Sequence, residues 1–355
     1  MGGFVLSFAE LDRLIGTVPG AVVTRLRSVD IGRGREDLYR NQLPALLTAL
    51  AHRARVESIT ASSAMEGIVV PDEARAAQII EGKAAVLRTR SEQELAGYRA
   101  AVDYLYATDW RPLNIGLLLH LHTLLFAQTR AGGGAFKSSD NLVVDRSPDG
   151  SIEVRFVPVP ARQTSFFAAE LVSRFTIASR AEEHHPLLLI GLFVLDLLTI
   201  HPFEDGNGRV VRVLTNALLE DAGYGVGRYV SLEQLIATSA DAYYAALLAS
   251  THGWHEESHD PWPWLSYFVE LMSRAYETFE ARAASDVFTG TKQARVRDYV
   301  LRRAPSIFRI ADVRAALPGV SDQTIRLVLD GLKAEEVIAP DGAGRAAVWR
   351  KRPRS

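Results

Sequence analysis

An apolar stretch at residues 187–200 constrains the fold of this chain more than any other feature. Its residues are hydrophobic on every side of a helix, with Asp196 as its single charged residue. A helix of that kind is stable when other parts of the protein cover it completely. The stretch is also too short to cross a membrane. We therefore expect it to form the central helix of a helical domain and to support whatever follows it rigidly.

The twelve residues after this stretch carry most of the chemistry. They read His201-Pro202-Phe203-Glu204-Asp205-Gly206-Asn207-Gly208-Arg209-Val210-Val211-Arg212. A base, a carboxylate, a small-residue turn and two arginines three positions apart stand together in this segment. An apolar pattern over residues 210–219, ended by Gly223, predicts a helix directly after the turn. The glycines should then lie at a helix N-terminus, where free N–H groups bind anions.

Helical periodicity covers most of the remaining sequence before residue 290. The predicted helices lie at residues 41–54, from residue 72, and at 92–106, 112–130, 164–180, 237–250 and 262–283. Strand character is confined to residues 136–160, where segments 142–144 and 152–157 flank the turn signal Pro148-Asp149-Gly150. The expected fold class is therefore mainly α with a small β-hairpin. Whether that hairpin is a lid, a docking edge or a structural ornament stays open.

The C-terminal segment is a different kind of surface. Residues 291–355 hold 14 Lys and Arg against 7 Asp and Glu, whereas the rest of the chain holds 26 against 35. After a predicted linker at 285–291, helices, a turn and two short apolar segments follow in the order of a winged helix-turn-helix over residues 292–355. Ser321 would cap its recognition helix, and the residues near the start of that helix are Gln323, Thr324 and Arg326.

Two uses of this C-terminal segment have equal weight. Its basic surface suits the phosphates of DNA. A winged helix can equally serve as a dimerisation or partner-docking module whose surface happens to be basic.

Cysteine is absent from the sequence, so a disulfide framework, a thiolate metal site and a cysteine nucleophile are excluded. The first residues lack the basic and then apolar pattern of a targeting signal. We expect a soluble, cytoplasmic protein without a membrane segment.

Residues 201–212 resemble the signature of the Fic family, His-x-Phe-x-Asp/Glu-Gly-Asn-Gly-Arg-x-x-Arg, and match it at every defined position. The resemblance extends over about residues 43–283. It implies an N-terminal helical region at 1–110 and a Fic catalytic core at 111–284. The region that is similar to the family's flap would dock the target through Phe136, Lys137, Leu142 and Val143.

The family implies transfer of AMP from ATP to a Ser, Thr or Tyr hydroxyl of a protein, with pyrophosphate leaving. The residue chemistry agrees, because His201, with an ordinary pKa of about 6.5, can take the hydroxyl proton during attack. Asp205 is a natural oxygen ligand for the Mg²⁺ that accompanies ATP. The groups expected to bind the nucleotide and its phosphates are Gly206, Asn207, Gly208, Arg209, Arg212, Tyr243 and Tyr244.

The second glycine of the turn bears on which group is transferred. Related Doc-type proteins carry lysine there and phosphorylate their targets. Gly208 occupies that position here, so the resemblance favours AMP transfer over phosphorylation. Another nucleotide, or a phosphocholine-type donor, stays open.

Ser62, Glu66 and Gly67 form a second motif on a helix predicted at about residues 58–67, where Ser62 and Glu66 share one face. By itself this spacing is that of a surface glutamate before a helix-ending glycine. Beside the signature it resembles the inhibitory motif Ser/Thr-x-x-x-Glu-Gly/Asn of the Fic subgroup that carries it before the core. The resemblance implies that Glu66 pairs with Arg212 and competes with the γ-phosphate for the same guanidinium.

Two functions from different classes therefore remain. In the first, the protein is a self-inhibited AMP-transferase that acts on an unidentified protein, or on itself. In the second, it is a DNA-binding transcriptional regulator whose Fic domain is a nucleotide-dependent or self-modifying switch. A homodimer stays open in both.

Overall fold

The computed structural model describes residues 6–42, 44–146, 152–288, 292–317, 319–341 and 348–352. The chain divides into two compact units. The first consists of residues 1–38 and 47–279, and the second of residues 39–46 and 280–355.

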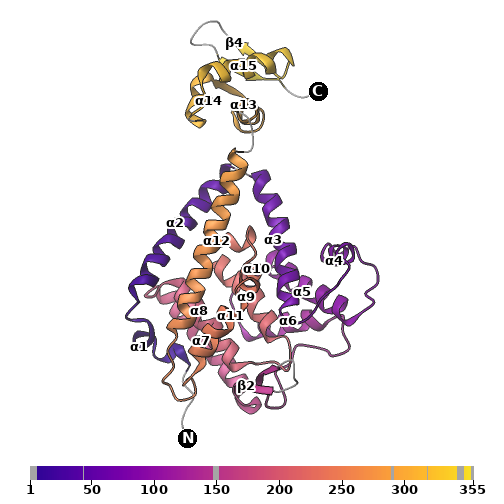
Figure 1. The fold of residues 1–355 in the computed structure, drawn as a ribbon, viewed down its shortest axis with the longest axis vertical. Helices are drawn as coiled ribbons and strands as arrows, with labels where there is room; N and C mark the ends of the chain where they lie inside the picture. The colour runs from indigo at the N-terminus through magenta and orange to yellow at the C-terminus, as the bar shows by residue number, and fades with distance from the viewer. Residues whose placement is uncertain are drawn as a thin grey trace. The chain divides into compact units, whose positions relative to one another are not determined.

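Helices make up most of the chain (Figure 1), which confirms the mainly α fold expected from the periodicity. Those before residue 289 are η1 (Ser7–Ala9), α1 (Leu11–Ile15), α2 (Gly20–Gln42), α3 (Pro44–Ala64), α4 (Glu73–Ile80), α5 (Arg90–Ala107), α6 (Ile115–Phe126), α7 (Ala161–Ala181), α8 (Pro186–Ile200), α9 (Asn207–Asp221), η2 (Gly225–Arg228), α10 (Leu232–Ala237), α11 (Ala240–Thr251) and α12 (Trp262–Phe288).

Helix α8 is the buried helix that the apolar stretch predicts. Every residue after Pro186 except Leu198 is buried. The carboxylate of Asp196 accepts hydrogen bonds from the Ser7 N–H and the Trp254 indole N–H, and burial raises its pKa to about 6. A buried acid with such partners is satisfied within the core. In the described ranges, no helix combines the length and apolarity needed to cross a membrane.

The expected hairpin consists of β1 (Val143–Arg146) and β2 (Ile152–Phe156), which pair antiparallel with Val144 opposite Val154. The pairing register shifts between Val143 and Val144. The predicted turn Pro148-Asp149-Gly150 lies outside the described residues. This pair is the small sheet of the first unit.

The second unit has its own apolar core, which includes Phe308, Ile325, Leu329 and Trp349. Its elements are α13 (Lys292–Asp298), the π-helical turn η3 (Tyr299–Arg303), β3 (Ile307–Arg309), α14 (Ile310–Ala316), α15 (Asp322–Ala334), β4 (Ile338–Asp341) and β5 (Val348–Lys351). The strands form an antiparallel sheet in the order β3-β5-β4.

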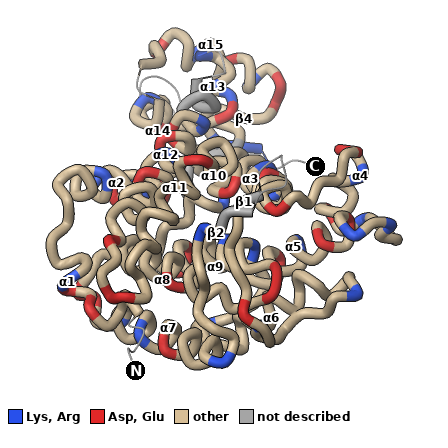
Figure 2. Tube along the Cα trace, turned by 60° about the horizontal axis from the view of Figure 1, so that its bottom comes forward, with Lys and Arg blue, Asp and Glu red and all other residues tan. Residues whose placement is uncertain are grey.

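The linker predicted at residues 285–291 begins inside α12, which continues to Phe288. A helix can persist there because residues 281–288 contain neither glycine nor proline. Residues 289–291 lie outside the described ranges. The second unit carries both signs of charge (Figure 2), with ion pairs such as Arg314–Asp322 and Arg297–Glu335.

Candidate functional site

His201 ends helix α8 in the left-handed conformation, with φ of 48°. This conformation turns the chain out of the helix directly after the buried segment. The ring Nδ1 lies 3.3 Å from the Leu198 carbonyl oxygen. Because a carbonyl can only accept, Nδ1 carries the proton and Nε2 keeps its lone pair. Burial lowers the pKa of His201 to about 4, so the ring is a neutral base at pH 7.

The side chain of Asn207 closes the turn before helix α9. Its Oδ1 accepts from the Phe203 N–H at 2.8 Å, and its Nδ2 donates to the Phe203 carbonyl at 2.8 Å. Its expected contribution to phosphate binding is therefore limited to the backbone N–H. Gly206, at φ of 81°, is the N-cap and offers no side chain to the first N–H groups of α9. Those groups are available to an anion.

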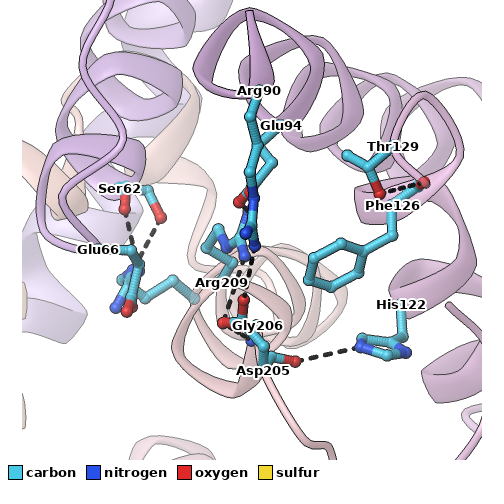
Figure 3. Close-up of polar contacts among 11 residues, drawn as sticks. Ser62, Glu66, Arg90, Glu94, His122, Phe126, Thr129, Asp205, Gly206 and Arg209 are labelled. Carbon is cyan, nitrogen blue, oxygen red and sulfur yellow. Dashed lines mark hydrogen bonds and ion pairs between the residues drawn. The ribbon is translucent and has the colours of Figure 1, made fainter. Parts of the chain in front are cut away.

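His122 stabilises this turn, although nothing in the sequence marked it beyond its place in a predicted helix. Its Nδ1 accepts from the Gly134 N–H at 2.9 Å, so its Nε2 carries the proton and donates to the Asp205 carbonyl at 3.1 Å. The ring stacks on Phe203 with centroids 4.0 Å apart. Burial lowers the pKa of His122. The neutral ring thereby ties α6 to the turn (Figure 3).

Asp205 presents the carboxylate expected to bind Mg²⁺. Its side chain is 56% exposed, Oδ1 accepts the Gly206 N–H at 2.6 Å, and Oδ2 lies 3.7 Å from Arg90. Among the described residues, no group of three or more His, Asp and Glu side chains could hold a metal ion. A single exposed carboxylate fits Mg²⁺, which takes its other ligands from phosphates and water.

Arg209, which is expected to bind the nucleotide or its phosphates, is buried. Its Nη1 donates to Oε2 of Glu94 at 2.7 Å, and its side chain is 1% exposed. Its guanidinium lies over the Phe126 ring, 5.1 Å from the centroid, and 3.6 Å from Asp205. These contacts hold the Arg209 guanidinium in a buried position beside Asp205. Glu94 belongs to a helix that the sequence predicted, but nothing in the sequence distinguished it from a surface glutamate.

Arg212 contacts both polar residues of the second motif. Its Nε donates to the Ser62 Oγ at 2.8 Å, and its Nη2 donates to the Ser62 carbonyl at 3.0 Å and to Oε1 of Glu66 at 2.7 Å. Helix α3 ends at Ala64 rather than at Glu66, and a turn follows in which Gly67 has φ of 73°. The motif therefore lies against the start of α9 (Figure 3).

Many residues of this site line a cavity of about 430 Å³. Its lining residues include Glu66, Val143, Arg155, Phe156, His201, Gly208, Arg212, Tyr243 and Tyr244. The histidine, the motif glutamate and the tyrosine pair expected at a nucleotide site thus share one space. A second cavity of about 510 Å³ is lined by residues of α3, α5 and α9, but by none of residues 201–212.

The expected docking residues do not share one environment. Lys137 is buried, and its amine donates to Asn141 at 2.8 Å and to the Ile200 carbonyl at 3.2 Å. Burial lowers its pKa to about 8. Phe136 lies 6.0 Å from the Phe203 ring, whereas Leu142 is exposed. Lys137 therefore holds the loop after α8 through these hydrogen bonds, and its side chain is not on the exposed surface.

The expected DNA-contacting residues belong to the second unit. Gln323 and Arg326 are exposed on α15. The Thr324 hydroxyl lies 2.9 Å from that of Ser321, whose Oγ accepts the Thr324 N–H at 3.3 Å as the helix cap. The cap that the sequence predicts at Ser321 is therefore present.

Together these features define a class of protein. It is a helical domain in which a neutral histidine ends a buried helix, a glycine turn begins the next, and both line one cavity. Residues 112–219 match the model of the Fic/DOC family. This part of the chain is a Fic/DOC family domain, which confirms the resemblance seen in the signature.

Two curated relatives carry the name "Protein adenylyltransferase Fic". The protein of Culex quinquefasciatus is 30% identical over 195 residues, which cover 53% of this chain and 34% of that protein. The protein of Drosophila grimshawi is 28% identical over 232 residues, covering 61% and 44%. The chain thus spans less than half the length of these relatives.

A solved structure has a similar fold over nearly the whole chain. It is a Fic family protein from Desulfovibrio desulfuricans G20, with a TM-score of 0.64 and 21% sequence identity. The similarity covers 96% of this chain and 98% of that one.

Proposed function

We propose that this protein is a protein adenylyltransferase, which transfers AMP from ATP to a Ser, Thr or Tyr hydroxyl of a protein, and that Glu66 restrains it. The observation that carries the proposal is the shared cavity of His201, Gly208, Arg212 and Glu66. This cavity is lined by the neutral base His201, by Gly208 at the N-terminus of α9 and by Arg212, which Glu66 holds. The names of the curated relatives support the same reaction.

The proposed chemistry follows from the atoms at the site. Nε2 of His201 takes the proton of the acceptor hydroxyl as the oxygen attacks the α-phosphorus. The bond between that phosphorus and the pyrophosphate oxygen breaks, and pyrophosphate leaves. N–H groups at the start of α9 would stabilise the growing charge on the phosphate. Mg²⁺ held by Asp205 would supply further neutralisation of the phosphates when bound.

Restraint would act through competition for Arg212. Its guanidinium already donates to Ser62 and to the Glu66 carboxylate. A γ-phosphate that needs this guanidinium must displace Glu66, because charge-assisted pairs of this kind are strong and directional. While Glu66 stays, ATP would bind with its α-phosphate misaligned for attack.

Mass spectrometry tests the transferred group and the acceptor together. The Glu66→Gly variant is incubated with ATP, Mg²⁺ and a cell lysate, and modified peptides are sequenced. We expect AMP on a Ser, Thr or Tyr side chain, either of a lysate protein or of the enzyme itself. Phosphate in place of AMP would overturn the proposed transfer, as would the same peptides from the Glu66→Gly, His201→Ala double variant.

We also propose that the second unit is a winged helix-turn-helix that binds duplex DNA. Exposed Gln323 and Arg326 near the start of α15 support this, as does the excess of Lys and Arg in the segment. The ion pair that Asp322 forms with Arg314 offsets part of that charge.

A cytoplasmic location stays a prediction from the sequence.

A gel shift of the full chain on duplex DNA, repeated over a range of salt, tests this second proposal. Binding that weakens steeply with salt and is reduced by Arg326→Gln would support it. Absence of a shift at low salt would favour docking of a protein instead.

A further inference from the structure

Arg90, at the start of α5, is a charged residue beside the site to which neither motif assigns a role. Its Nε donates to Oε1 of Glu94 at 2.5 Å, and its Nη2 lies 3.7 Å from Oδ2 of Asp205. We propose that Arg90 binds the outer phosphates of the nucleotide, and that Glu94 positions it. This inference rests on the proposed function, because it takes a nucleoside triphosphate as the ligand.

The signature arginines are both engaged in the restrained protein. Arg209 is 1% exposed and is held by the buried carboxylate of Glu94. Moving it to a phosphate in solvent would break its buried ion pair with Glu94, which is costly. Arg212 is 5% exposed and is held by Glu66. Outer phosphates that enter while Glu66 is in place therefore need another cation.

Arg90 has the exposure and the location that such a cation needs. Its side chain is 71% exposed, so its guanidinium can move without loss of packing. Figure 3 shows it extending from α5 toward Asp205, above Arg209. The contact with Asp205 is long, and a long exposed ion pair is weak. Arg90 can leave that carboxylate at little cost.

Binding of the nucleotide would itself release Arg90 from Asp205. A metal ion and a guanidinium repel each other when they share one carboxylate. Phosphate oxygens that arrive with the metal offer the guanidinium a bidentate partner in its place. Glu94 keeps hold of the Nε of Arg90 during this exchange. One carboxylate thus positions two arginines, the buried Arg209 and the exposed Arg90.

Titration calorimetry with MgATP and with AMP separates this role from a structural one. AMP lacks the outer phosphates, so its binding affinity should not depend on Arg90. In the otherwise wild-type chain, Arg90→Gln should weaken MgATP binding by about tenfold. AMP binding should change by less than about twofold. Arg90→Lys keeps the charge and should recover most of the MgATP affinity.

The matched control is Arg88→Gln, which removes the same charge from an exposed arginine two residues away. It should leave both affinities unchanged. Unchanged MgATP affinity in Arg90→Gln would overturn the inference, and so would an equal loss for MgATP and AMP. The proposed function fails separately, if labelled ATP modifies no protein while Arg90→Gln still weakens the binding of MgATP.

Discussion

Oε1 of Glu66 lies 2.7 Å from Nη2 of Arg212. The same oxygen occupies the space that a side chain at position 208 would need. A Cβ on Gly208 would come within 2.4 Å of that oxygen and within 2.8 Å of Nη1 of Arg212. Glycine in the turn therefore serves two purposes. It leaves the N-terminus of α9 open to an anion, and it leaves room for the Glu66–Arg212 pair.

The first prediction concerns Gly208→Ala, which should separate Glu66 from Arg212 by crowding. Alanine favours a helix by about 1 kcal/mol over glycine. Here the disruption of the Glu66–Arg212 pair should cancel that gain in folding stability. In the Glu66→Gly background the closer contact, with Oε1, is absent, and only the movable end of the Arg212 side chain stays near the new Cβ. Part of the gain should therefore reappear. A thermodynamic cycle from chemical unfolding should give a coupling of at least about 0.5 kcal/mol. Additive effects would contradict the predicted crowding.

The second prediction concerns Ser62, which accepts a hydrogen bond from Nε of Arg212. Ser62→Ala should loosen the restraint and raise protein labelling by roughly tenfold or more, because one hydrogen bond to a charged group is worth about 1.5–3 kcal/mol. Neighbouring Ser63 is the control, because its buried Oγ has no hydrogen-bond partner among the described residues. Ser63→Ala should leave the labelling rate unchanged. Equal rates in the two variants would argue against a role for Ser62.

The third prediction concerns pH. Burial lowers the pKa of His201 to about 4, so the ring is already deprotonated between pH 6 and pH 8. A base acts in its deprotonated form. The labelling rate should therefore not fall as the pH is lowered through about 6.5, the ordinary histidine pKa. Single-turnover labelling by the Glu66→Gly variant, measured from pH 5 to pH 8, checks this. An acid limb centred near pH 6.5 would contradict burial of the base.

The fourth prediction concerns Glu94. Glu94→Gln removes the charge that balances buried Arg209, and loss of one partner of a buried pair costs about 3 kcal/mol. Unfolding in urea should show a loss of that order. Asp103 is the control on the same helix, because its side chain is 47% exposed and pairs with Arg55. Asp103→Asn should cost less than about 1 kcal/mol. Similar losses in the two variants would contradict the special burial of Glu94.

Local patterns predicted the parts of the site that lie close together in the sequence. The apolar stretch predicted the buried helix before His201, and the glycines predicted the turn at the start of α9. The resemblance further connected Glu66 with Arg212 across the chain. The family domain is confirmed, whereas the roles of the site residues stay predictions.

Long-range partners could not be predicted in the same way. Glu94 and Arg209 are 115 positions apart, and neither carries a local mark of the other. His122 has ordinary helical neighbours, and its role depends on a carbonyl 83 positions away. In the sequence, Lys137 has the pattern of a solvent-facing lysine. Only the folded structure places the Ile200 carbonyl beside its amine. Such contacts depend on tertiary packing, which periodicity does not encode.

The most direct test compares the wild-type protein with Glu66→Gly, each incubated with Mg²⁺ and with ATP labelled at either the α- or the γ-phosphate. We predict that Glu66→Gly incorporates α-label into protein at least about tenfold faster than the wild type, with no γ-label, and that His201→Ala in the same background incorporates neither. Equal α-labelling by the wild type and Glu66→Gly would contradict the proposed restraint, and incorporation of γ-label would contradict AMP transfer itself.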